Sequence, residues 1–242
     1  MNKKLYILLL TMFVLLSCKK EKINNLIQMG IKGKAKSMEV LNLNFQNTPE
    51  AYVVPKIVFE FNEKGFITEE TEYDDNGVHN RIQYEYDEEN NYLGKKILDE
   101  NLEKIGECIS VGNLPNKREE DCTVKNSIYK TSRFLEGNVY TELYLYRNEQ
   151  EEFEQYKKEI IHFDKKMNMT SKESYGFSDE VDFTNHYQYN SKGIVQKIVI
   201  KDKNGKIIED LDYNCMEVDV EGNCIQYKIS DGTEIKYNIE YY

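Results

Sequence analysis

A short turn motif recurs along this chain and divides it into segments of strand length. An aromatic or apolar residue precedes Asn or Asp, two further residues, Gly or a substitute for it, and then a new alternating segment. The copies of the motif begin at Phe61, Tyr86, Phe163, Tyr189 and Val218. Internal repeats of this kind indicate an array of similar supersecondary units.

Tighter turn sequences lie between these copies. They are Asp75-Asn76-Gly77, Lys203-Asn204-Gly205 and Ser230-Asp231-Gly232. Asn-Gly and Asp-Gly between alternating segments predict β-hairpins with type I′ turns, in which both central residues take a positive φ. Each repeat is therefore expected to contain two strands and two turns.

The segments between turns alternate apolar and polar residues with period two. Residues 80–86, 181–189 and 233–241 show this pattern, which is typical of antiparallel strands with one packed and one wet face. From the spacing of the turns we expect roughly a dozen strands. Nineteen tyrosines suit such a sheet, because the ring packs while the hydroxyl stays solvated.

Residues 149–163 allow two interpretations. Phe153, Tyr156, Ile160 and Phe163 are spaced as on one face of a helix. The last residues alternate as a strand that leads into a motif copy, and we favour the strand. A short helix around residues 149–160, packed on the sheet, is the alternative.

The runs Tyr84-Glu85-Tyr86-Asp87 and Tyr187-Gln188-Tyr189-Asn190-Ser191-Lys192-Gly193 resemble YD-repeat (Rhs-type) sequences. That resemblance covers about residues 55–95 and 158–242. It implies an all-β fold, an antiparallel meander of hairpin repeats that forms a large twisted, curved sheet. The segment Ile31–Ser37 also resembles the start of small exported bacterial lipoproteins with such repeats, which implies a location but no activity.

The N-terminus has the pattern of a secretory leader. Lys3 and Lys4 precede an apolar run too short to span a bilayer, and Leu15-Leu16-Ser17-Cys18 resembles a bacterial lipobox. The resemblance implies cleavage before Cys18 and acylation of its thiol, which would anchor the chain in a membrane. An ordinary signal peptide with a chance cysteine is the alternative.

These features divide the chain into a cleaved signal peptide (1–17), a lipidated tether (18–29) and one β-repeat domain (30–242). We expect a protein of the bacterial cell envelope, lipid-anchored in the outer membrane, with the periplasmic face favoured over the surface. The net charge is −11, and the leader would remove two lysines. Such acidity argues against nucleic acid as a partner, because binding to nucleic acid depends on neutralising phosphates.

Four cysteines remain after Cys18. An even number in an exported protein predicts two disulfides. We favour pairing by sequence neighbourhood, Cys108 with Cys122 around a polar loop and Cys215 with Cys224 across a hairpin. Four free thiols are the alternative. No Cys/His spacing predicts zinc, and no metal or other cofactor is expected.

The sequence contains no recognisable catalytic motif. His79, His162 and His186 are interpreted as surface residues. The acidic pair Asp74-Asp75 and the acidic run 119–121 are interpreted as solvated turn charges, although paired carboxylates could serve glycoside hydrolysis. The segment Asp202–Gly205 is similar to a calcium loop but lacks its terminal acid, so a hairpin turn explains it better.

Two features could bind a partner: the loop expected between Cys108 and Cys122, and tyrosines such as Tyr144 and Tyr146. The favoured interpretations are an irregular connection for the loop and rings that cover the core for the tyrosines. We therefore expect a non-enzymatic envelope protein that serves as a binding or structural module for a protein or glycan partner. An immunity-type protein that neutralises a toxin, and a glycan hydrolase with paired carboxylates, are the alternatives.

Overall fold

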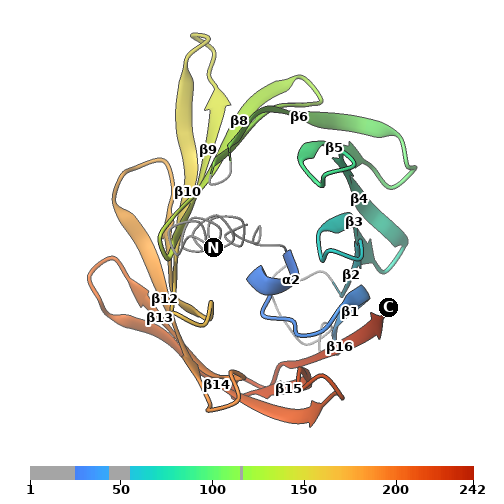
Figure 1. Cartoon of the computed structure of the whole chain (residues 1–242). Coiled ribbons are helices and arrows are strands. Elements are labelled where there is room, and N and C mark those ends of the chain that lie inside the picture. The colour runs from blue at the N-terminus through green and yellow to red at the C-terminus, as the bar shows by residue number, and fades with distance from the viewer. Residues whose placement is uncertain (1–24, 44–54, 115–116) are drawn as a thin grey trace, which may run out of the picture.

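The chain forms a closed barrel of sixteen antiparallel strands in a computed structural model, which describes residues 25–43, 55–114 and 117–242. Every strand pairs with its neighbours in the sequence, and β1 closes the ring by pairing with β16 (Figure 1). The strands are β1 (Ala35–Asn42), β2 (Lys56–Phe61), β3 (Ile67–Asp74), β4 (Gly77–Tyr86), β5 (Tyr92–Leu98), β6 (Lys104–Leu114), β7 (Lys117–Val124), β8 (Ser127–Glu136), β9 (Val139–Arg147), β10 (Phe153–Phe163), β11 (Met169–Tyr175), β12 (Val181–Tyr189), β13 (Val195–Asp202), β14 (Ile207–Val218), β15 (Cys224–Ile229) and β16 (Glu234–Tyr241).

The expected all-β antiparallel meander is confirmed, but the expected open, curved sheet is wrong. Its two edges meet in register, with Val40 of β1 opposite Tyr237 of β16. Closure satisfies the backbone groups that an open sheet would leave unpaired at its edges. A ring of sixteen strands is also too wide for its own side chains to fill, so it leaves a lumen.

The repeated motif forms one type of hairpin turn. In the turn after β2, the Asn62 side-chain oxygen accepts hydrogen bonds from the backbone N–H groups of Lys64 and Phe66, at 3.0 and 3.1 Å. Gly65 takes a φ of +80°. The Asn-Gly turn after β13 has the same geometry, with Asp202 as the acceptor and only Gly205 at positive φ. At the other two tight turns, Gly77 and Gly232 take a positive φ, and the residues before them do not. The expected type I′ turns are therefore wrong at all three positions.

Residues 153–163 form the single strand β10, so the alternative of a helix around residues 149–160 is wrong. The pairing of β10 with β9 shifts between Gln155 and Lys157. A β-bulge of this kind adds one residue to the strand and interrupts its alternation. Phe153 lies on the outer face, opposite Arg147, whereas the Tyr156 ring packs inside the barrel. The helix-like spacing in the sequence therefore does not mark residues on one face.

The short helix α2 (Asn25–Gln28) lies inside the ring of strands, beside β1 and β2 (Figure 1). Its residue Leu26 is buried in a core with Met38, Phe61 and Ile67. The Asn25 side chain accepts a hydrogen bond from the backbone N–H of Ile67, at 3.0 Å. The last residues of the expected tether are thus packed against the barrel. Within the described ranges, no helix has the length and hydropathy needed to cross a bilayer.

Candidate functional site

The lumen of the barrel has two chemically different walls. Strands β12 to β16, with β1 and β2, present tyrosines and aliphatic side chains, whereas β5 to β9 present buried charges. Within each wall, inward residues of neighbouring strands lie opposite one another, as Tyr187 lies opposite Ile198 and Ile198 opposite Leu211 in the first. We describe the two walls separately as the tyrosine wall and the ionic wall.

The tyrosine wall borders a cavity of about 1300 Å³. This volume is somewhat larger than that of common small-ligand pockets. Tyr213, Tyr227 and Tyr237 stack edge to face on successive strands, with ring centroids 5.9 and 6.2 Å apart. Burial raises the pKa of Tyr213 to about 12, as it does for Tyr189, so these hydroxyls are neutral hydrogen-bonding groups at physiological pH. The wall therefore offers an apolar surface with a few polar positions.

Tyr144 and Tyr146, which the sequence suggested as a binding platform, belong to an aromatic group separate from the tyrosine wall. Both rings contact Tyr156, at centroid distances of 5.9 and 6.3 Å. Burial raises the pKa of Tyr144. These rings pack against one another beside the ionic wall, and they are not among the residues that border the cavity.

One end of the cavity is bounded by three copies of the repeated turn and by residues 29–32, which connect α2 to β1. Lys32 ties this connection to the turns, because its ammonium group donates to the carbonyl oxygens of Lys192 and Gly222 at 3.0 and 3.2 Å. Asn223 is buried and exchanges two hydrogen bonds with the Lys32 backbone, at 2.7 and 3.0 Å. We call this end, where the chain crosses the turns, the mouth.

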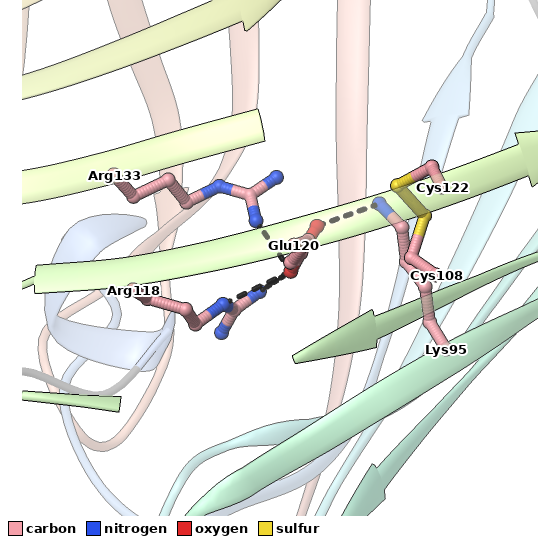
Figure 2. The surroundings of a disulfide bond; sticks show 6 residues. All are labelled: Lys95, Cys108, Arg118, Glu120, Cys122 and Arg133. Atoms are coloured by element: carbon pink, nitrogen blue, oxygen red, sulfur yellow. Dashed lines mark hydrogen bonds and ion pairs between the residues drawn. A yellow bond between two sulfur atoms is a disulfide. The ribbon is translucent and has the colours of Figure 1, made fainter. Parts of the chain in front are cut away.

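The ionic wall is centred on Glu120 of β7, whose side chain is fully buried. Arg118 donates to its Oε1 at 2.8 and 3.0 Å, and Arg133 donates to the same oxygen at 2.7 Å. The Lys95 ammonium lies 4.0 Å from Oε2. Figure 2 shows the two arginines on one side of Glu120, and Lys95 with a disulfide on the other. Arg133 also pairs with Glu142.

The cations of the ionic wall stabilise the ionised form of the Glu120 carboxylate. Burial alone would raise the pKa of Glu120, but Arg133 and Arg118 outweigh it and keep that pKa below its usual value. Burial lowers the pKa of Lys95, against the attraction of Glu120. A carboxylate fixed as an anion by three cations is suited to stabilising structure and not to donating a proton.

Two disulfides connect the four candidate cysteines as neighbours in sequence. Cys108 of β6 is bonded to Cys122 of β7, directly across the ladder, and Cys215 of β14 is bonded to Cys224 of β15. The segment expected as a polar loop inside the first disulfide instead continues β6 and β7. Glu120 lies close enough to both sulfurs to suggest a metal site. Because the sulfurs are bonded to each other and cations surround the carboxylate, the group does not suit a metal ion.

The carboxylates singled out in the sequence lie apart from the cavity. Asp74 and Asp75 are exposed at the β3–β4 turn, as expected. The run 119–121 was expected at a turn, but it lies within β7, with Glu120 pointing inward and Glu119 pairing with Lys117 outside at 3.0 Å. Burial raises the pKa of Glu70 inside the barrel. Glu70 does not border the cavity, where Asp164 is the one acid among the described residues.

The remaining predicted residues lie on the outer face or outside the described ranges. His79 and His162 are partly exposed and lie 3.6 and 3.4 Å from Asp74 and Glu173. Cys18, the predicted lipidation site, is outside the described residues. The cavity itself was not predicted, because alternation places tyrosines on one face but does not say that this face encloses a lumen.

Comparisons with known proteins find similarity in solved structures alone. No family model and no curated protein matches the chain. A Bacteroides fragilis protein of unknown function is 14% identical over 50% of this chain and 91% of its own, with a TM-score of 0.33. A porin-like protein from Bacteroides uniformis is 11% identical, over 86% of this chain and 99% of its own, with a TM-score of 0.38. The crystal structure of TcdB2-TccC3-TEV is 10% identical over 74% of this chain and 11% of its own, with a TM-score of 0.35. At these values, none of the three assigns an activity to this chain.

Proposed function

We propose that this protein is a lipid-anchored envelope protein that binds a small, largely apolar molecule in the lumen of its barrel without transforming it. The cavity of about 1300 Å³ beside the tyrosine wall is the observation that supports this proposal. A concave, mostly apolar site with a few polar groups is the usual form of a small-molecule site in proteins. This geometry favours a small ligand over the protein or glycan partner that the sequence suggested.

The chemistry bordering the cavity supports binding over catalysis. Hydrolysis by paired carboxylates needs one acid that is protonated and another that is ionised, facing each other across the substrate. Asp164 borders the cavity, but its oxygens accept hydrogen bonds from Asn168 and from the backbone N–H of Lys166. The bonds from Asn168 hold the pKa of Asp164 below its usual value. Such a carboxylate is a poor proton donor.

The absence of tryptophan from the sequence makes a direct test possible. Tyr213→Trp would place a single fluorescent reporter on the cavity, and Tyr73→Trp would place the same reporter on β3, away from it. In a full-length Cys18→Ala chain, we expect decanol to change the emission of the first reporter saturably and to leave the second unchanged. No saturable change, or an equal change in both chains, would overturn the proposal. Membrane fractionation tests the anchor: Cys18→Ala should move the protein into the soluble fraction.

A further inference from the structure

The residues that border the cavity have a charge balance opposite to that of the whole chain. The sequence carries 43 acidic and 32 basic residues. In contrast, the described residues around the cavity include four lysines and one acid, Asp164. The lysines are Lys32, Lys165, Lys166 and Lys192, and we call them the mouth lysines.

The mouth lysines lie together because of the fold. Lys165 and Lys166 occupy the β10–β11 turn, and Lys192 occupies the β12–β13 turn. Both turns follow even-numbered strands and so lie at the same end of the barrel. Lys32 reaches the same place from the connection that crosses these turns, where it binds the carbonyl oxygen of Lys192.

Their positive charge is available to a ligand. Within the ranges that the structure describes, none of the four ammonium groups forms a salt bridge with a carboxylate. Asp164 is the nearest acid in the sequence to Lys165 and Lys166, and its oxygens are already hydrogen-bonded within its own turn. Elsewhere in the barrel lysines are commonly paired, as Lys197 is with Asp210 at 2.6 Å.

We propose that the lumen binds an acidic amphiphile, whose aliphatic or aromatic body lies against the tyrosine wall while its anionic head group meets the mouth lysines. This inference rests on the proposed function and adds the class of ligand to it. The apolar tyrosine wall would exclude a fully hydrated anion. The mouth lysines would favour an acid over an alcohol of the same chain length. A long-chain carboxylate and a lipid phosphate share this chemistry.

Titration of the Tyr213→Trp, Cys18→Ala chain with decanoate, decyl phosphate, decanol and decylamine tests the proposal. Three exposed lysines acting on one anion should make decanoate bind about tenfold more tightly than decanol at low salt. Decylamine should bind most weakly. Added salt should reduce the advantage of the anions, since the head group is exposed at the mouth. Comparing the phosphate with the carboxylate distinguishes the two sources of the acid.

The decisive variant is Lys165→Gln, Lys166→Gln, Lys192→Gln, which should remove the preference for decanoate and leave decanol binding unchanged. Its matched control is Lys201→Gln, Lys203→Gln, Lys206→Gln at the opposite end of the barrel, which changes the net charge equally. Equal binding of decanoate and decanol, or an equal loss in both triple variants, would overturn the inference while the lumen remained a binding site. Binding of neither compound would overturn the proposed function as well.

Discussion

Glu120 is a residue on which the ionic wall of the lumen depends. Its Oε1 accepts hydrogen bonds from both Arg118 and Arg133, and Lys95 lies beside its other oxygen. Neutralising this carboxylate would leave three partly buried cations near one another. Removing one partner of a buried ion pair strongly lowers the free energy of unfolding, because the remaining charge stays buried without a partner. This loss is much larger than the stability that the intact pair adds over an apolar pair of similar size.

We therefore predict that Glu120→Gln lowers the free energy of unfolding by about 3–5 kcal/mol. Urea denaturation with linear extrapolation measures the loss. The matched control is Glu119→Gln, the next residue, which pairs outside the barrel with Lys117 and should change stability by less than about 0.5 kcal/mol. A similar effect of both substitutions would contradict the burial of Glu120 on the inner wall.

The same residue predicts how stability depends on pH. Arg133 and Arg118 hold the folded-state pKa of Glu120 below its unfolded value, despite the opposing effect of burial. A depressed acid pKa contributes stability above the unfolded pKa, and that contribution is lost as pH falls through the folded one. Acidification below about pH 4.5 should thus destabilise the unmodified protein more steeply than Glu120→Gln.

At the scale of the hairpin, the repeated turn requires one residue with positive φ. The structure adds three turns of this geometry, which begin at Asp99, Asn148 and Asp202, to the five copies seen in the sequence. Glycine supplies the positive φ in four of the eight turns: Gly65, Gly193, Gly205 and Gly222. In the other four, the residue at that position has a φ between 60° and 66°: Asn90, Leu102, Glu151 and Met167. An L-residue with a β-carbon pays about 1–2 kcal/mol for the left-handed region. The backbone of the turns without glycine is therefore strained, and a glycine at the positive-φ position should relieve that strain.

We predict that Leu102→Gly raises the melting temperature, with a gain of about 0.5–1 kcal/mol after the greater chain entropy of glycine is subtracted. Leu102 has φ +62° and is 50% exposed as a whole residue, so little packing is lost. Glu100→Gly in the same turn, where φ is negative, is the control and should destabilise the protein. A lower melting temperature for Leu102→Gly than for Glu100→Gly would show that this turn does not carry the strain.

The hairpins are also the part of the fold that the sequence predicted well, because both of their determinants are local. Alternation marks the strands, and the Asn or Asp that accepts two backbone hydrogen bonds marks the turns. The alternation was misleading where a bulge interrupts it, near Tyr156. The run of acids around Glu120 was misleading in another way, because three neighbouring acids in one strand resemble the acidic residues of a turn.

At the scale of the whole molecule, closure determines the site, and closure is not local. The pairing of β1 with β16 joins residues about 200 positions apart, and no motif in either strand specifies it. Only after closure do the inward tyrosines of β12 to β16 enclose a cavity with Met38 and Val40. The sequence thus predicted the surfaces of the strands and could not predict the lumen that they form together.

Closure can be tested by a disulfide between β1 and β16. Glu39 lies opposite Asn238, and the two outward side chains are hydrogen-bonded at 2.6 Å. We predict that Glu39→Cys with Asn238→Cys forms an intramolecular disulfide on mild oxidation, seen by thiol titration and gel mobility. By closing a very long loop, it should stabilise the protein by about 2–4 kcal/mol. Glu39→Cys with Glu234→Cys, on the same face but out of register, should not cross-link. Equal cross-linking of both pairs, or of neither, would mean that β1 and β16 are not held in the register that closes the barrel.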